Sequence, residues 1–67
     1  MQRYLVNSTR IRSVGWENNV MELQFWDGAI YQYLNVSQDE YLRFLNSPSL
    51  GRALVIIEKF HPYIRVC

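Results

Sequence analysis

The stretch from Val20 to Val36 constrains the fold most, because it has the pattern of a β-hairpin. Two runs rich in β-formers, VMELQFW and AIYQYLNV, flank the dipeptide Asp27-Gly28. This dipeptide between alternating apolar residues is a strong short-range hairpin signal. Tyr31 and Tyr33 are two positions apart in the second run, so they lie on one face of the sheet. That face is either part of the core or a working surface.

A two-residue Asp27-Gly28 turn is the first of two registers that the hairpin allows. It pairs position 24 with 31 and position 22 with 33. Trp26, Tyr31 and Tyr33 then share a polar face and form an exposed platform on which a ligand stacks. Hydrophobic counting favours this register, because the opposite face is almost entirely apolar.

A three-residue loop closed by Gly28 as a bulge residue gives the second register, which pairs 23 with 31 and 21 with 33. Tyr31 and Tyr33 then pack against Leu23 and Phe25 under the helices, with their hydroxyls reaching polar partners at the rim of the core. Turn chemistry favours this arrangement, and we adopt it as the prediction. The side chains left exposed are those of Arg10, Arg12, Glu22, Gln24, Ile30, Gln32 and Leu34.

A further strand is predicted from Thr9 to Trp16, ahead of the hairpin. A bulge near Gly15 would restore its alternation and send Arg10 and Arg12 to the face opposite Ile11. Residues 17–19, Glu-Asn-Asn, make the connecting turn, because asparagine tolerates positive φ. Residues 4–6 either dock on the core or fray.

Two helices follow. Ser37 and Glu40 form a capping box that begins a helix over 38–46. A second helix starts after Ser47 or Ser49 and ends before His61, because Pro62 disfavours helical geometry in its predecessor. Its spacing predicts a buried stripe made of Leu50, Ala53, Leu54, Ile57 and Phe60. Gly51 is expected where another backbone approaches closely, and Val55 points away from the stripe.

The fold class predicted is α+β: a three-stranded antiparallel meander followed by two helices packed on one face, with residues 63–66 as a possible short edge strand. With 67 residues, the chain forms a single domain near the lower size limit for a hydrophobic core. The single cysteine, Cys67, excludes an intrachain disulfide and suits a reducing compartment. We expect no signal peptide, no membrane segment and a cytoplasmic location.

Catalytic and metal-binding residues are not expected. His61 is the only histidine and it stands at a helix end, where a capping role is commoner than catalysis. Asp39 and Glu40 are explained by the helix dipole and the capping box. One histidine and one cysteine do not supply the three or four ligands that zinc requires. We therefore predict no enzyme activity, no cofactor and no metal.

Several short motifs make the chain resemble a known family. They are Ile11, Val14-Gly15-Trp16, Leu23-Gln24-Phe25, Gly28, Tyr31-Gln32-Tyr33, Val36 and Ser49-Leu50-Gly51. Their order resembles that of the KTSC domain, a module found at the C-terminus of some lysyl-tRNA synthetases and as single-domain bacterial and phage proteins. The chain departs from the family pattern at Ser37, where proline is expected, and at Trp16, where tyrosine is usual. By its association with a tRNA enzyme, the resemblance implies an RNA-binding accessory module.

Two binding functions therefore remain open. In the first, the domain binds single-stranded or structured RNA, through Arg10, Arg12, Gln24 and Gln32 in the adopted register, or through Trp26, Tyr31 and Tyr33 in the other. The formal net charge of +1 predicts modest affinity for RNA, although Arg3, Arg10 and Arg12 make the first part of the chain basic. In the second, the domain binds another protein or a second copy of itself, through apolar residues left outside one core: Ile30, Leu34, Val55 and Val66.

Overall fold

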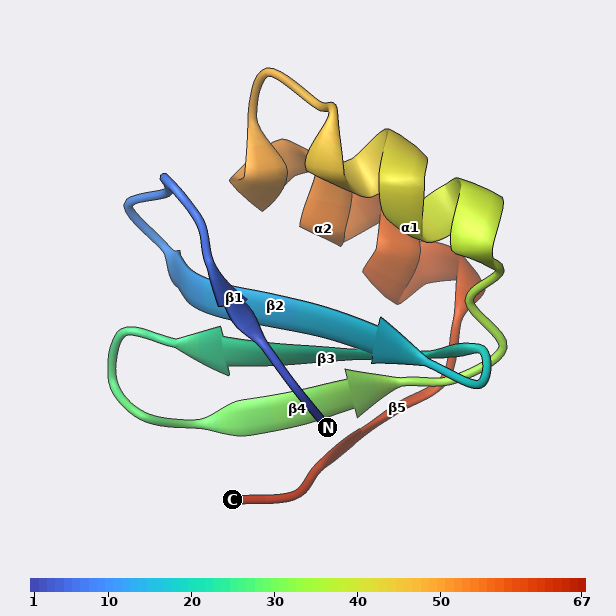
Figure 1. The fold of residues 1–67 in the computed structure, drawn as a ribbon, viewed down its shortest axis with the longest axis horizontal. Helices are drawn as coiled ribbons and strands as arrows, with labels where there is room; N and C mark the ends of the chain where they lie inside the picture. The colour runs from blue at the N-terminus through green and yellow to red at the C-terminus, as the bar shows by residue number, and fades with distance from the viewer.

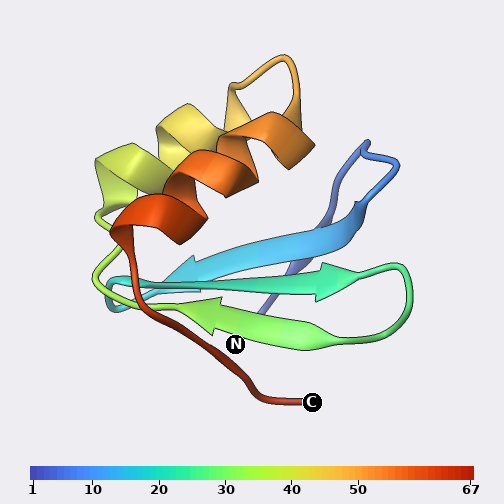
Figure 2. The ribbon, with the colours of Figure 1, turned by 180° about the vertical axis from the view of Figure 1, so that it is seen from behind.

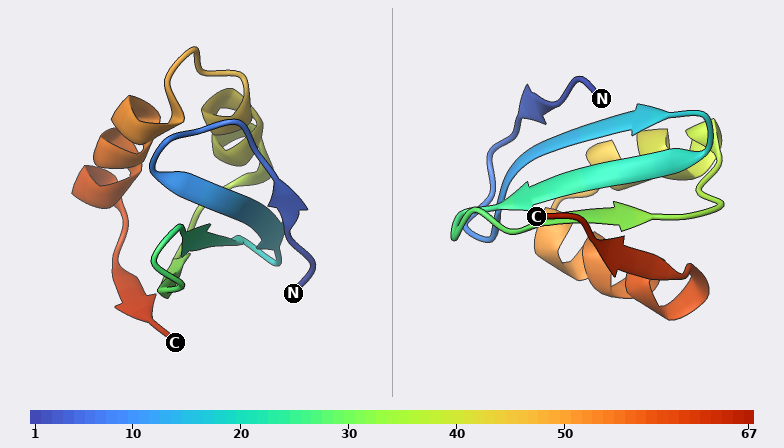
Figure 3. Two further views of the ribbon diagram at one scale, coloured as in Figure 1. Left: turned by 90° about the vertical axis from the view of Figure 1, so that its left-hand side faces the viewer. Right: turned by 90° about the horizontal axis from the view of Figure 1, so that it is seen from below.

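A five-stranded antiparallel sheet covered on one face by two helices makes up the domain (Figure 1). The computed structural model describes all of residues 1–67. The elements are β1 (Tyr4–Leu5), β2 (Ile11–Glu17), β3 (Val20–Phe25), β4 (Ile30–Tyr33), α1 (Gln38–Leu45), α2 (Leu50–Phe60) and β5 (Tyr63–Arg65). The strands lie in sequence order across the sheet, with β1 and β5 at its edges (Figure 3).

The α+β class, the central meander and the C-terminal edge strand are confirmed, but the number of strands was underestimated. The fifth strand is β1, in which Tyr4 and Leu5 pair with Val14 and Ser13 of β2. A strand of two residues is too short to show alternation in the sequence, so β1 can be recognised only from its pairing with β2. Seen from behind, both helices lie on the same side of the sheet (Figure 2), and neither is long and apolar enough to cross a lipid bilayer.

The central hairpin has the second of the two registers. Leu23 lies opposite Tyr31 and Met21 opposite Tyr33. The Phe25 N–H donates to the Ala29 carbonyl at 2.9 Å, and Gly28 has a φ of 95°. Glycine adopts this left-handed angle without a steric penalty. The turn chemistry therefore decides the register, against the hydrophobic count.

β2 contains the predicted bulge, but at a different residue. The register shifts between Ile11 and Ser13, so the extra residue is Arg12 rather than one near Gly15. Gly15 has another role: a Cβ added there would lie 2.1 Å from the Gln2 carbonyl oxygen. The backbone before β1 therefore packs directly on β2, on the face away from the helices. The turn after β2 uses positive φ at Asn18 and Asn19, as predicted.

A polar network occupies that second face. The Arg3 guanidinium donates to Glu22 Oε2 at 2.6 Å and to Ser13 Oγ at 3.1 Å. Gln32 donates to the other Glu22 oxygen at 2.8 Å. The expectation that Glu22 is exposed is wrong: only 6% of the residue is accessible, because the N-terminal segment covers it.

α1 begins at the predicted capping box. The Ser37 hydroxyl accepts from the Glu40 N–H at 3.2 Å, and the Ser37 N–H donates to Glu40 Oε1 at 3.1 Å. A proline at position 37 would have no N–H to donate to Glu40. The serine found here instead of the family's proline therefore allows both hydrogen bonds of the capping box. The helix ends at Leu45, with Asn46 as its C-cap.

α2 is capped by Ser49, whose hydroxyl accepts from the Arg52 N–H at 3.3 Å. Leu54 and Ile57 are buried as predicted, but Phe60 is 75% exposed. Two successive three-residue steps turn a side chain by about 120° away from its starting direction. Phe60 therefore leaves the stripe that begins at Leu54. The expectation for Gly51 is also wrong, since a Cβ there would meet nothing within 4 Å.

The core lies between the helices and the sheet. Its fully buried side chains are those of Ile11, Val14, Met21, Leu23, Tyr33, Val36 and Leu54. Trp16 stacks on Tyr41 of α1, and its ring N–H donates to the Val36 carbonyl at 2.7 Å. The His61 ring lies 3.0 Å from the Leu34 carbonyl through Nδ1 and 2.7 Å from Glu40 Oε2 through Nε2. This ring joins the end of α2 to the start of α1 and the end of β4.

Candidate functional site

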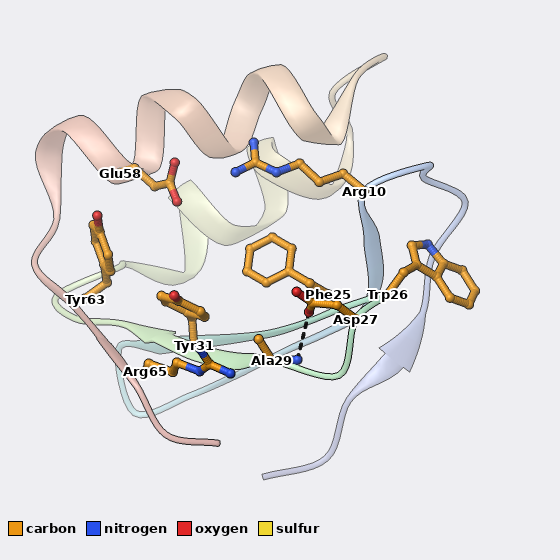
Figure 4. Close-up of a pocket in the computed structure, with 9 residues that line it drawn as sticks. All are labelled: Arg10, Phe25, Trp26, Asp27, Ala29, Tyr31, Glu58, Tyr63 and Arg65. Atoms are coloured by element: carbon orange, nitrogen blue, oxygen red, sulfur yellow. Dashed lines mark hydrogen bonds between the residues drawn. The ribbon is translucent and has the colours of Figure 1, made fainter.

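An open cleft of about 500 Å³ lies between α2, the β3–β4 turn and β5. Figure 4 shows aromatic rings along its sheet side and charged groups above and below them. The strands position the sheet side of the cleft, because alternate side chains on β4 and β5 point towards the helices. Its lining residues are Arg10, Phe25, Trp26, Asp27, Ala29, Tyr31, Glu58, Tyr63 and Arg65.

The aromatic rings of the cleft form a connected row. Phe25 meets Tyr31 edge-to-face, with 5.5 Å between ring centroids, and Tyr31 lies 6.0 Å from Tyr63. Tyr63 continues the row to the buried Tyr33 at 5.3 Å. Tyr63 is 48% exposed and Trp26 57% exposed. The inner rings therefore belong to the packing, while Tyr63 and Trp26 still offer surface to a ligand.

Three arginines of this region have no carboxylate partner. The ion pairs of the molecule are Arg3–Glu22 and His61–Glu40. The Arg10 guanidinium instead lies over the Phe25 ring, 5.5 Å from its centroid, and Arg12 lies over Trp26 at 5.6 Å. Arg65 donates through Nε to the Cys67 carbonyl at 2.9 Å. Their guanidinium N–H groups therefore remain available to an anion.

Two carboxylates also line the cleft, and each has one oxygen in a hydrogen bond. Asp27 Oδ1 accepts from the Ala29 N–H at 3.0 Å. This side-chain hydrogen bond lies within the β3–β4 turn. Glu58 Oε2 accepts from the Tyr33 hydroxyl at 3.0 Å. Burial, together with the hydrogen bond to Glu58 and its negative charge, raises the pKa of Tyr33 far above its usual range. Tyr33 therefore stays a donor that fixes the position of the Glu58 carboxylate.

The expectation that Arg10 lies with Gln24 and Gln32 on the face away from the helices is wrong, because its guanidinium lies over Phe25 in the cleft. The predicted binding residues are therefore divided between two faces. Arg10, Trp26 and Tyr31 line the cleft, and Arg12 lies beside Trp26. Gln32 lies on the other face, hydrogen-bonded to Glu22, while Gln24 accepts a long contact of 3.5 Å from Ser13. Tyr33 is buried behind the cleft, as the adopted register predicts.

Six residues of the cleft were not predicted as binding residues: Phe25, Asp27, Ala29, Glu58, Tyr63 and Arg65. Tyr63 and Arg65 carried a usable signal. They are two apart on the predicted edge strand and pair with Tyr33 and Tyr31, so they share the face of the Tyr-x-Tyr motif. No signal in the sequence indicated Glu58, because its position over the sheet depends on how α2 packs on the sheet.

A second, smaller groove of about 390 Å³ lies between the helices, and Arg43, Phe44, Arg52 and Ile57 are among its lining residues. It contains none of the binding residues predicted from the sequence. No three His, Cys, Asp or Glu side chains lie close enough together to hold a metal ion.

The fold defines a class of small α+β domain, in which an antiparallel meander is covered on one face by two consecutive helices. The KTSC domain profile matches residues 7–55. The chain belongs to the KTSC domain family, which confirms the resemblance stated from its motifs. A crystal structure of a KTSC domain protein from Yersinia pestis has the same fold, with a TM-score of 0.92 and 32% identity over 98% of this chain and 97% of that one.

A sequence relative extends the comparison. An uncharacterized protein of Stutzerimonas stutzeri (strain A1501) is 35% identical over 54 residues, which are 78% of this chain and 76% of the relative. Family and fold are therefore established.

Proposed function

We propose that this domain is a non-enzymatic module that binds single-stranded RNA, and that the cleft is its binding site. One observation carries the proposal: exposed aromatic rings and arginines without carboxylate partners meet in a single open cleft. Single-stranded nucleic acids are held by this combination, because bases stack on rings while cations contact the backbone.

Stacking supplies the affinity for the base. Tyr63 at the mouth of the cleft has about half of its surface free. A base that enters over Tyr63 and Tyr31 gains about 1–3 kcal/mol from aromatic stacking. Phe25 and Trp26 each already carry a guanidinium over the ring, so a base that stacks on that side of either ring competes with an arginine.

Arg10 and Arg65 supply the contacts to phosphate. They lie on opposite sides of the row formed by Phe25 and Tyr31 (Figure 4). A nucleotide whose base lies between the two arginines has its 5′ and 3′ phosphates on different sides. Each guanidinium can then contact one of these phosphates. The formal net charge of +1 adds little long-range attraction, so the affinity rests on these local contacts.

The test is a titration of single-stranded RNA at several salt concentrations. Two phosphate contacts predict a slope of about −1.4 in log K against log salt, which weakens binding roughly sevenfold between 50 and 200 mM. Arg65→Ala should weaken binding and reduce the slope by about 0.7. Arg43→Ala, at the groove between the helices, is the matched control and should bind like the parent protein. Binding that does not depend on salt, or an equal loss in both variants, would contradict the proposal.

A homodimer is the second candidate function, and a specific observation favours it. β5 is an edge strand whose three residues are all exposed, Ile64 by 50% among them, and Phe60, three residues before the strand, is 75% exposed. An open edge strand is a template for pairing with a second copy. Sedimentation in reducing buffer should then show a dimer that Ile64→Lys dissociates. A monomer at high concentration excludes this candidate.

A further inference from the structure

We propose that the cleft selects guanine, by presenting the Glu58 carboxylate to the Watson–Crick edge of the stacked base. This inference rests on the proposed function and adds the identity of the base. It starts from the fact that two carboxylates stand in a cleft proposed to bind a polyanion. A carboxylate repels phosphate and accepts only from N–H or O–H groups, so it marks where the base lies.

Glu58 is the carboxylate that is fixed for this purpose. It projects from α2 over the aromatic row, between Tyr63 and Arg10 (Figure 4). The hydroxyl of the fully buried Tyr33 donates to its Oε2 at 3.0 Å. Tyr33 is held by the core, so the carboxylate is oriented before any ligand arrives. Its Oε1 makes no hydrogen bond within the protein, and the half-buried residue lines the cleft.

The donor pattern of the bases decides between them. Guanine carries two adjacent donors, N1–H and the N2 amino group, which match the two oxygens of one carboxylate. Adenine and cytosine each offer one amino group next to an acceptor nitrogen. Uracil offers one N–H between two carbonyl oxygens, and both of those are repelled by the carboxylate. Guanine is therefore the only base that donates two hydrogen bonds to Glu58 without placing one of its own acceptor atoms against the carboxylate.

Arg10 completes the match. It lies beside Glu58 on the α2 side of the cleft (Figure 4), and the two side chains form no ion pair with each other. Guanine presents the O6 acceptor next to its N1–H donor, so one N–H of Arg10 fits that edge, while its other N–H groups remain for the phosphate that follows the base. The Asp27 carboxylate needs no such role, because its hydrogen bond to Ala29 explains it as a turn residue.

The experiment compares single-stranded oligouridines that differ at one central nucleotide: uridine, guanosine or inosine. A bidentate contact predicts that guanosine binds roughly 5- to 150-fold more tightly than uridine. Inosine lacks the N2 amino group and should fall between them. Glu58→Gln should bring the guanosine and uridine affinities to within about twofold, while the all-uridine oligomer binds at least as well as before. A carboxylate that only supported the fold would not change this ratio.

Tyr33→Phe is the second variant, because it removes the hydrogen bond to Glu58 and keeps the ring. It should lower the preference for guanosine and leave uridine binding unchanged. Circular dichroism establishes that each variant is folded. If all the oligomers bind with equal affinity, the inference is wrong and the proposed RNA function stands. If none binds, the proposed function and this inference fail together.

Discussion

At the scale of single residues, Glu22 shows how a charged side chain is tolerated inside so small a domain. Burial raises its pKa, but the hydrogen bonds from Gln32 and Arg3 and the positive charge of Arg3 outweigh that effect. The net result is a pKa below the ordinary value of 4.5. A buried charge is stable when it is paired and hydrogen-bonded on both oxygens, as it is here.

This shift predicts a pH dependence of stability. A carboxylate whose pKa is lower in the folded state stabilises the fold above its unfolded pKa, and this contribution disappears as the pH falls through the folded pKa. The free energy of unfolding should therefore fall between about pH 5 and pH 3. Urea denaturation of Glu22→Gln should show a smaller fall over the same range. The Glu40 carboxylate, whose pKa is also lowered, is common to both proteins and serves as the internal reference. Identical pH profiles would exclude this role of Glu22.

Gly15 and Gly51 give a second prediction, because one is sterically required and the other is not. Gly15→Ala places a methyl group against the Gln2 carbonyl. We expect a loss of about 1–3 kcal/mol in the free energy of unfolding, typical of an overpacked site. Gly51→Ala meets nothing and should gain about 0.5–1 kcal/mol through the lower entropy of the unfolded chain. Thermal denaturation of both variants measures this, and a stable Gly15→Ala would mean that the N-terminal segment does not pack on β2.

At the scale of elements, α2 shows what periodicity predicts and what it misses. The spacing identified Leu54 and Ile57 as buried. It failed at Phe60, because the side-chain direction drifts with each three-residue step and the helix ends there. The direction of a side chain can be predicted from its position in a helix. The extent of the sheet beneath the helix cannot be predicted in this way, although it decides whether the side chain is buried.

Ile57 and Ile56 form a matched pair for testing the docked face of α2. Ile57 is 7% exposed and Ile56 is 59% exposed, so the same truncation samples both environments. Ile57→Ala should lower the free energy of unfolding by about 2–5 kcal/mol, as removal of a buried side chain does. Ile56→Ala should change it by less than about 0.5 kcal/mol. Chemical denaturation of both variants checks this, and equal losses would place α2 in a different rotation.

The hairpin shows a similar division. Asp27 and Gly28 predicted its turn, and Gly28 has a left-handed φ of 95° in the bulged loop that the strand pairing defines. Counting apolar residues pointed to the wrong register, because it treated the second face as open to solvent. Part of that face is covered by the segment before β1, and Ile30 and Leu34 are half-buried.

At the scale of the whole molecule, the features that depend on distant contacts were the ones that the sequence could not predict. β1 is recognised only by its pairing with β2, and Glu22 is buried by a residue 19 positions away. The cleft likewise joins Arg10, the β3–β4 turn, Glu58 of α2 and the C-terminal strand. Local patterns predicted most elements, whereas the site exists only after they are assembled.

The location of RNA binding is the central claim, and NMR spectroscopy tests it most directly. Addition of a short single-stranded RNA to the isotope-labelled protein should shift backbone amide signals around the cleft, in residues 25–31, at Glu58 and in β5. Signals of β1 and of the groove bordered by Arg43 and Arg52 should stay unchanged. Shifts confined to those regions, or no shifts at all, would contradict the account.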